Sequence, residues 1–235
     1  MKIGLLSDAH GNHLGLQTCL QFLLRNAVDE IIFLGDAVGY FSKGNQVLEL
    51  LKQSAVKCLL GNHDAMMIER LPLDPKNDEV YKIAATRQKL LSVHKDFLST
   101  WVPFLEKQIG GKRLLFVHGN PGNPIAGYTY PDSCLDGFRD LPYDAIFMGH
   151  THIPFVEEKS GKLIVNVGSC GLPRDQGDLA ACAIYDSGSG RVEIFRVPID
   201  INKIIQLEGE NIHPQVIECL KRKSLTKVVG CVIEK

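Results

Sequence analysis

Short apolar runs that stop at residues able to bind a metal ion recur along this sequence. The first run, Lys2 to Leu6, ends in Asp8 and His10, and the apolar stripe of a helix follows it through about Asn26. In an extended Asp-x-His segment both side chains point to the same side, so that one ion can contact both. A strand, a polar turn and a helix in this order place ligands at the carboxyl end of a strand in an α/β sheet.

Four more apolar runs end in the same way. Each has the length of a buried strand, and each is followed by a carboxylate, an amide or an imidazole. The residues in these positions are Asp36, Asn62, His118, and the pair His150 and His152. A surface scatter of the eight histidines would not place four of them at strand ends, so we interpret the set as one constellation.

The order of the expected elements indicates an α/β fold with two sheets. Strands and helices alternate in the first half, which is typical of a mostly parallel sheet, whereas the second half is rich in hairpin signals. We therefore predict a four-layer αββα sandwich, in which two packed mixed sheets are flanked by helices. The pattern also predicts a strand over 56–60, one long helix over 78–101 and a short helix over 132–140.

Length and composition limit the classes of protein to consider. The chain has 235 residues and a formal net charge of -1, which gives no electrostatic argument for a nucleic-acid or membrane partner. No run approaches the roughly 18 apolar residues of a spanning helix, and the seven cysteines include no CxxC pair. We expect a cytoplasmic protein and a single domain over 1–235, with 199–235 as an appended helical segment; the oligomeric state stays open.

The chemistry of the constellation indicates the kind of ion. Imidazoles, carboxylates and one amide oxygen suit Mn, Fe, Zn or Ni, and we expect manganese first among these divalent ions. Seven ligands are too many for one tetrahedral ion and suit two ions that share a carboxylate. Two ions about 3.5–4 Å apart form the usual clamp for in-line displacement at phosphorus.

Five sequence blocks in a fixed order resemble the calcineurin-like metallophosphoesterases. They are Asp8-Ala9-His10, Gly35-Asp36, Gly61-Asn62-His63-Asp64, His118-Gly119 and Gly149-His150-Thr151-His152. Further segments, such as Asn166-Val167-Gly168-Ser169 and Pro173-Arg174-Asp175, resemble the bacterial YfcE-like and diadenosine-tetraphosphatase-like subgroup of phosphodiesterases and phosphatases.

The resemblance implies a role for each residue of the constellation. Asp8, His10, Asp36 and His152 would hold the first ion, and Asp36, Asn62, His118 and His150 the second, so that Asp36 bridges them. A hydroxide between the ions would attack phosphorus in line with the leaving oxygen. His63 would face the phosphate and protonate the leaving group, and Asp64 would orient His63, cap a helix, or do both.

Residues that would contact the substrate are indicated less sharply. Asn12 either touches the phosphoryl group or turns the chain, and Arg174 either clamps a phosphate or forms a salt bridge with Asp175. Tyr40, like Phe41, Tyr128 and Tyr130, either stacks on a base or belongs to the core.

The predicted activity is hydrolysis of a phosphate ester, either a phosphodiester or a phosphomonoester, with a small phosphoester or a nucleotide as substrate. Two alternatives remain. One is a protein serine/threonine phosphatase. The other is a metal-binding scaffold of the same fold that serves protein–protein interaction, although the scaffold in the retromer lacks the His of the third block, which is His63 here.

Overall fold

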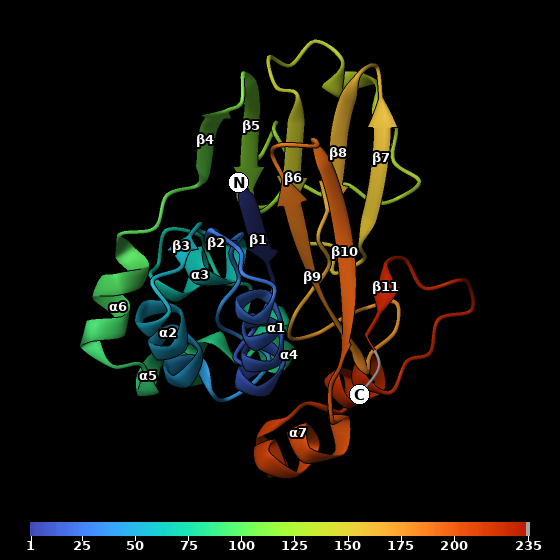
Figure 1. Cartoon of the computed structure of the whole chain (residues 1–235). Coiled ribbons are helices and arrows are strands. Elements are labelled where there is room, and N and C mark those ends of the chain that lie inside the picture. Colours follow the sequence, from blue (N-terminus) through green and yellow to red (C-terminus); the bar gives the residue numbers. More distant parts are fainter. Residues whose placement is uncertain (234–235) are drawn as a thin grey trace.

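The computed structural model describes residues 1–233 and contains two mixed β-sheets packed face to face (Figure 1). The first sheet has the strand order β11-β10-β9-β1-β2-β3. Its strands are β1 (Lys2–Leu6), β2 (Glu30–Phe33), β3 (Lys57–Cys58), β9 (Leu179–Asp186), β10 (Arg191–Pro198) and β11 (Cys231–Val232). The second sheet has the order β4-β5-β6-β8-β7. Its strands are β4 (Phe104–Ile109), β5 (Lys112–Val117), β6 (Ala145–Met148), β7 (Phe155–Lys159) and β8 (Lys162–Asn166).

Parallel strands form one half of the first sheet and the centre of the second. The strands β1, β2 and β3 run parallel, with Leu6 opposite Phe33, while β9 pairs with β1 antiparallel. In the second sheet β5, β6 and β8 run parallel, and the antiparallel strands β4 and β7 form its edges. The predicted strand over 56–60 is shorter than expected: β3 ends at Cys58, and Leu59, whose N–H still donates to Phe33 (2.8 Å), forms an isolated bridge with Val102.

The space between the sheets is filled by alternate residues of the facing strands. Ile3 and Leu5 of β1 point inward, whereas Leu6 points to the opposite face, as the period of two in a strand requires. Across the interface, the ring of Phe147 in β6 meets the ring of Tyr185 in β9 edge to face, with their centroids 5.1 Å apart. This apolar layer holds the two sheets at a fixed separation.

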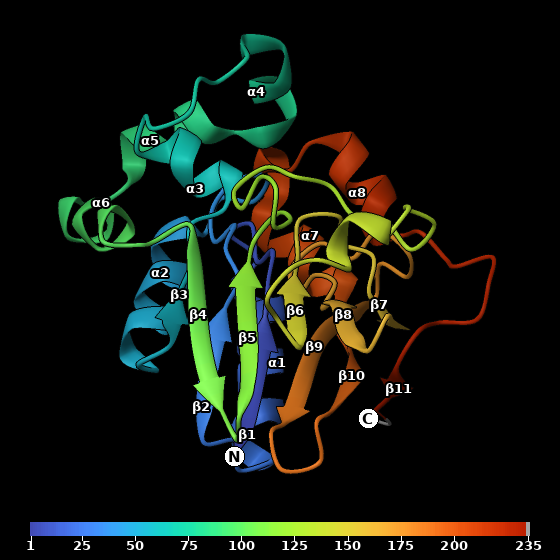
Figure 2. The ribbon, with the colours of Figure 1, turned by 90° about the horizontal axis from the view of Figure 1, so that it is seen from above.

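Helices cover the outer face of the first sheet. The helices α1 (His13–Arg25) and α2 (Gly44–Gln53) lie side by side against it (Figures 1 and 2). Leu16, Leu20 and Leu23 of α1 recur at helical spacing and are buried in the core below. The short helix α3 (Asn62–Met67) joins this layer.

The outer face of the second sheet carries an irregular segment. Leu135, Phe138 and Leu141 of this segment pack against β5 and β6, at a spacing of three that matches a 3₁₀ turn. The predicted helix over 132–140 is therefore wrong in type and length, because its only regular part is the 3₁₀ turn η1 (Asp136–Phe138).

The prediction of two mixed sheets flanked by helices is confirmed.

The predicted long helix over 78–101 is also wrong. The segment forms three helices, α4 (Pro75–Tyr81), α5 (Ile83–Lys89) and α6 (Ser92–Ser99). Lys82 adopts the left-handed conformation with φ 58°, and Leu90 is extended, so neither can continue the helix before it. The apolar residues are spaced for a helix in each part, and sequence periodicity did not detect the two breaks.

The C-terminal segment packs as part of the fold. It contains α7 (Ile201–Glu208), the 3₁₀ turn η2 (Gly209–Asn211), α8 (Pro214–Leu220) and β11, which pairs with β10. Ile204, Val216 and Leu220 are buried in the core outside the first sheet. Residues 234–235 of the predicted appended segment lie outside the described residues.

Across residues 1–233, none of the helices has both the length and the apolar character needed to cross a membrane.

Candidate metal centre

The predicted ligands meet where the carboxyl ends of the two sheets come together. Asp8 and His10 follow β1, Asp36 follows β2, Asn62 begins α3 after β3, His118 follows β5, and His150 and His152 follow β6. The six carboxylate and imidazole residues are nearly inaccessible to solvent, and Asn62 is half-buried. Two main-chain groups connect the sheets here: the N–H of His150 donates to Asp8 (3.0 Å), and the ring of His118 donates to the carbonyl of Leu34 (3.0 Å).

Most of the predicted ligands have a left-handed backbone conformation, which directs their side chains toward the centre. Asp8, His10, Asp36, His150 and His152 all have φ between 52° and 67°. Asp and His tolerate this conformation better than most residues, and single residues held in it cluster at functional sites. The extended Asp-x-His segment expected from the sequence is therefore wrong, because Asp8 and His10 converge through two left-handed residues.

Main-chain carbonyls fix the tautomer of three histidines. The Nδ1 atom of His10 donates to Val38 (3.2 Å), that of His152 to Leu172 (2.7 Å), and that of His118 to Leu34. A carbonyl oxygen only accepts, so each Nδ1 carries a hydrogen and Nε2 of the neutral ring offers its lone pair to the centre. Such outer hydrogen bonds are usual for histidines that bind metals.

Each carboxylate divides its two oxygens between the backbone and the centre. Oδ2 of Asp8 accepts the N–H of His150, and Oδ1 of Asp36 accepts the N–H of His63 (2.8 Å). The remaining oxygens, Oδ1 of Asp8 and Oδ2 of Asp36, face the imidazoles. Oδ1 of Asp8 has no hydrogen-bond partner in the described chain although it is fully buried.

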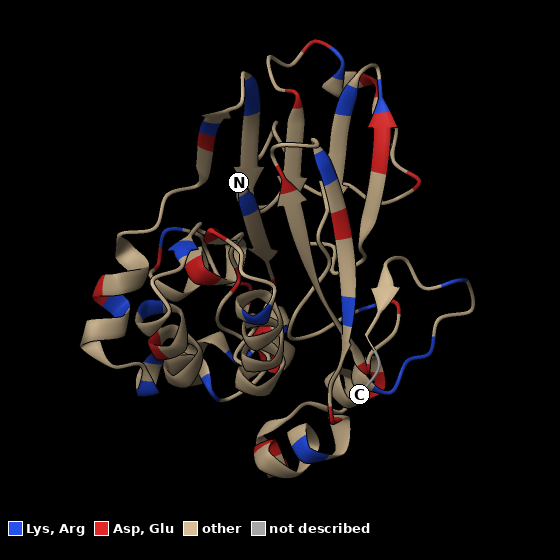
Figure 3. Ribbon diagram, viewed as in Figure 1, with Lys and Arg blue, Asp and Glu red and all other residues tan. Residues whose placement is uncertain are grey.

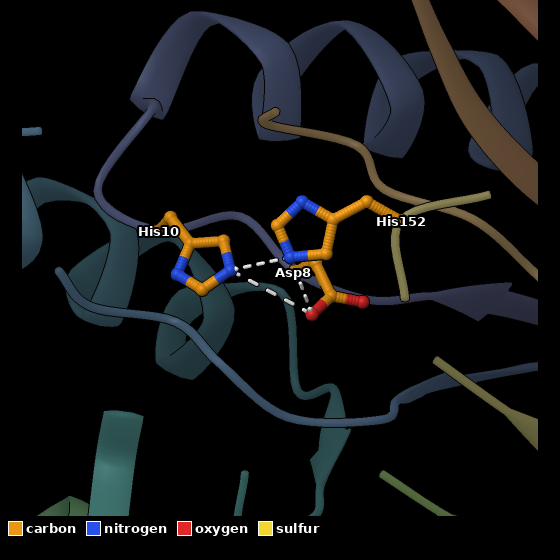
Figure 4. A group of neighbouring side chains, drawn as sticks. All are labelled: Asp8, His10 and His152. Carbon is orange, nitrogen blue, oxygen red and sulfur yellow. Dashed lines mark hydrogen bonds and ion pairs between the residues drawn. The ribbon is translucent and has the colours of Figure 1, made fainter. Parts of the chain in front are cut away.

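Two pairs of imidazoles surround these oxygens. Nε2 of His10 and Nε2 of His152 are 2.9 Å apart, and they lie 3.6 and 3.3 Å from Oδ1 of Asp8 (Figure 4). In the second pair, Nε2 of His118 is 3.1 Å from Nδ1 of His150. Oδ1 of Asn62 is 3.2 Å from the same atom of His118.

The electrostatic balance at the centre favours a cation. Burial alone raises the pKa of Asp8, but the imidazoles of His152 and His118 outweigh it and hold that pKa well below its ordinary value. Burial lowers the pKa of His118, yet Asp36 and Asp8 reverse this and raise it to about 9. Burial lowers the pKa of His150 to about 3 and that of His152 to about 4, so these rings are neutral donors at neutral pH.

The donor set fits divalent metal ions. Two nitrogen ligands at right angles on an ion, each at about 2.1 Å, lie about 3.0 Å apart, which matches the spacing inside both imidazole pairs. The groups of neighbouring donors are Asp8, His10 and His152, then Asp36, His118 and His150, and a third that adds His63 to His10 and Asp36. An ion would also satisfy the buried Oδ1 of Asp8.

His63 lies beside the centre in a box of aromatic rings. Its ring stacks on Tyr40 (centroids 5.0 Å), meets the edge of His10 (4.6 Å), and packs against Tyr81 (4.4 Å). Burial lowers the pKa of His63 well below its ordinary value. Gly39 has φ +98°, and a Cβ there would come within 2.4 Å of Nδ1 of His63, so only glycine leaves room for this ring.

Asp64 does not orient His63. Its carboxylate accepts the N–H groups of Asp36 (2.7 Å), Ala37 (2.9 Å) and Gly61 (3.1 Å). The prediction that Asp64 fixes the tautomer of His63 is wrong, because both oxygens are bound to the backbone of the two turns that carry Asp36 and Asn62. The alternative prediction, a cap at the N-terminus of a helix, is met in part: Gly61 is the N-cap residue of α3, and Asp64, three positions on, accepts its N–H.

The three predicted substrate contacts lie around the centre in different roles. Asn12 caps α1 by accepting from Gly15 (3.1 Å), and it donates to Gly171 (2.7 Å), so its amide is already engaged. Tyr40 is buried, and its hydroxyl accepts from Arg174 (3.2 Å). The predicted alternative of a salt bridge between Arg174 and Asp175 is wrong.

Asp175 pairs instead with the buried guanidinium of Arg196, at 2.5 and 2.9 Å. This leaves Arg174 directed toward Tyr40. Of the aromatic residues that the sequence left open, Phe41 is in the core, whereas Tyr128 and Tyr130 are exposed and stacked. Tyr128 lies over His150, with centroids 4.1 Å apart.

Sequence reasoning missed two supports of the centre. Tyr81 contacts His63 from the end of α4, but the expected long helix hid the break that places it there. The loop after β8 holds the end of β1, since Ser169 donates to the carbonyl of Asp8 (2.7 Å) and Cys170 to that of Ser7 (2.9 Å). The segment Asn166-Val167-Gly168-Ser169 of this loop carries part of the family resemblance, and its contacts with the end of β1 give a structural reason for it.

The comparison with protein families agrees with this geometry. Residues 1–189 match the calcineurin-like phosphoesterase superfamily domain. The chain therefore belongs to the calcineurin-like phosphoesterases and is a metal-dependent phosphoesterase, as its five sequence blocks predicted.

Relatives extend the match to nearly the whole chain. The uncharacterised protein MJ0912 of Methanocaldococcus jannaschii is 32% identical over 230 residues, which are 91% of this chain and 94% of that protein. The phosphodiesterase YfcE of Escherichia coli is 25% identical over 227 residues, covering 92% of this chain and 97% of YfcE. The predicted resemblance to the YfcE-like subgroup is confirmed.

Solved structures share the architecture. A metallophosphoesterase from Sphaerobacter thermophilus has a TM-score of 0.77 and 28% identity, over 94% of this chain and 98% of that chain. The hypothetical protein PH1004 from Pyrococcus horikoshii has a TM-score of 0.82 and 22% identity over the same shares, and this likeness concerns the fold.

Proposed function

We propose that this chain hydrolyses phosphate esters of small molecules or nucleotides with two divalent metal ions, by in-line displacement at phosphorus. Asp8, His10, Asp36 and His152 would hold one ion, and Asp36, Asn62, His118 and His150 the other. Manganese suits this set of imidazole, carboxylate and amide ligands, with iron, zinc and nickel as alternatives.

The position of Asp36 carries the proposal. Its Oδ2 lies 3.7 Å from Nε2 of His10, in the first imidazole pair, and 3.3 Å from Nε2 of His118, in the second. One oxygen thus faces both pairs, while the other is held by the N–H of His63. A carboxylate oxygen placed between two sets of nitrogen donors is suited to bridge two ions.

Two divalent ions, when bound, lower the pKa of water toward neutrality and offset negative charge at phosphorus. The residues of the chain position the proposed ligands and the group beside the leaving oxygen. Asp64 fixes the turns that carry Asp36 and Asn62, and the main-chain carbonyls accept from Nδ1 of His10, His118 and His152, so that Nε2 of each ring faces the centre. His63, beside the centre and held by aromatic rings, would face the departing oxygen. Burial lowers the pKa of its ring, so the ring would have to take up a proton in the substrate complex before it could donate one.

The test is the metal content and activity of Asp36→Asn. Wild-type protein stripped with a chelator and reloaded with Mn²⁺ should contain two ions per chain by elemental analysis and hydrolyse bis(p-nitrophenyl) phosphate. An amide presents one oxygen, so the variant should lose at least one ion and nearly all activity. Asp96→Asn, at an exposed aspartate of α6, is the control and should behave as wild type. Two ions and full turnover in Asp36→Asn would contradict the proposal.

A further inference from the structure

A pocket of about 440 Å³ lies beside the metal centre, on the side of the aromatic box. Its inner wall is formed by Tyr40, Tyr81 and Arg174, and its outer walls come from α4 and α8. Both helices lie at the same side of the molecule in Figure 2. The wall from α8 lies beyond residues 1–189, so the part of the chain that matches the family does not form this pocket by itself.

The pocket is basic. Lys76, Arg174 and Arg222 line it, and no aspartate or glutamate among the described residues does so. None of the three cations has a carboxylate of the described chain within 4.0 Å, although other cations nearby are paired, as Lys223 is with Asp178. Basic residues also follow α8 along the chain toward β11 (Figure 3).

Direct contacts connect the pocket to the metal centre. Arg174 donates through Nη2 to the hydroxyl of Tyr40, and the ring of Tyr40 packs against His10 and His63. The main-chain N–H of Arg174 also donates to the carbonyl of His152 (3.3 Å). Arg222 is fixed to the same place, since its Nη1 donates to the carbonyl of Arg174 (2.9 Å).

We propose that this pocket binds a second phosphate group of the substrate, separate from the phosphate at the metal centre. The inference rests on the proposed function, because it assigns the part of the substrate beyond the scissile bond. A guanidinium presents parallel N–H donors that match phosphate oxygens, and two guanidinium groups and an ammonium suit a dianion better than a single carboxylate. The apolar residues Val80, Leu172 and Val216 line the remaining wall and suit the organic part between the two phosphates.

A matched pair of chromogenic substrates tests the proposal. One is the p-nitrophenyl diester of thymidine monophosphate, and the other is the same diester with an additional phosphate on the free sugar hydroxyl. Both release nitrophenolate, so the ratio of their kcat/KM values isolates the distal phosphate. With the Mn²⁺-loaded full chain we expect the additional phosphate to raise kcat/KM about tenfold, as one or two partly exposed charge-assisted hydrogen bonds would.

Substitutions then locate the effect. Arg174→Gln and Arg222→Gln should each reduce the ratio toward one, whereas Lys221→Gln should leave it unchanged. Lys221 is the matched control, because it is an exposed cation next to Arg222 that does not line the pocket. Titration calorimetry of thymidine bisphosphate against thymidine monophosphate gives the same contrast without turnover.

The outcomes separate the two proposals. If wild type hydrolyses both substrates with equal kcat/KM, the phosphate pocket is refuted and the phosphoesterase proposal stands. If neither substrate is hydrolysed with any of the four metals, the proposed function fails. The pocket would then still be supported by tighter binding of the bisphosphate that depends on Arg174 and Arg222, or refuted by equal binding of the two nucleotides.

Discussion

Single residues at the centre reach their positions by using the backbone as a partner. His10, His118 and His152 each give Nδ1–H to a carbonyl, and Asp8 and Asp36 each accept one N–H. The atoms left over point to the same small volume, where lone pairs and negative charge concentrate. Because these side chains are already held in place, they would lose little further conformational entropy when an ion binds.

His63 separates chemistry from metal binding, and its removal provides a prediction. His63→Ala should keep two ions per chain and lose ~10²-fold or more in kcat on an alkyl ester, where a proton must reach the leaving oxygen. The loss should be smaller on an aryl ester, because nitrophenolate leaves without a proton. Metal analysis and kcat on both esters, in one buffer, measure this.

Two results would change the role of His63. Equal losses on the alkyl and aryl esters would favour stabilisation of charge on the phosphoryl group over proton donation. Undiminished turnover on both would remove His63 from the mechanism.

At the scale of secondary structure, a break between two helices helps to build the site. The left-handed Lys82 ends α4 directly after Tyr81, whose carbonyl accepts the N–H of Tyr40 (2.6 Å) and whose ring packs on His63. A continuous helix through this point would carry Tyr81 away from the aromatic box. The break is thus part of the geometry that places His63.

A substitution at the break tests this description. A lysine in the left-handed conformation costs about 1 kcal/mol that glycine avoids, so Lys82→Gly should raise the free energy of unfolding by about that amount. Lys89→Gly, at a right-handed position of α5, should lower it by about 0.5–1 kcal/mol. Urea unfolding followed by circular dichroism gives both values. Destabilisation of the Lys82 variant equal to that of the control would indicate a continuous helix.

At the scale of the whole molecule, the centre depends on two sheets that pack face to face with their carboxyl ends on the same side. The C-terminal segment stands apart from this arrangement, since it provides no predicted ligand. It adds β11 to the first sheet, buries apolar residues of α7 and α8, and supplies the outer wall of the basic pocket.

Shortening the chain after Pro198 is therefore predicted to leave two metal ions per chain. It should lower the melting temperature, because buried Ile204, Val216 and Leu220 are lost, and it should abolish any preference for the second phosphate. Leu220→Ala is the milder companion variant, expected to cost about 2–5 kcal/mol of stability without loss of metal. Loss of both ions from a variant that remains folded would show that the segment shapes the centre itself.

The sequence by itself determined the fold class and the composition of the site. The period of two in the strands and of about 3.6 in α1 is a local signal. For that reason β1 and α1 agree with expectation to within a few residues. The ligand types at the strand ends were readable for the same reason, since parallel strands necessarily end at the same edge of a sheet.

Only the tertiary structure decided how those residues act together. The left-handed conformations of Asp8 and His10 have no local sequence pattern. Two contacts join residues that are far apart in the sequence: Asp64 accepts the backbone N–H of Asp36, and Asp175 pairs with Arg196. The basic pocket likewise combines α4, the loop at Arg174 and α8. Local periodicity carries no information on such contacts, because the free energy that selects them comes from packing between elements and not from the sequence within one.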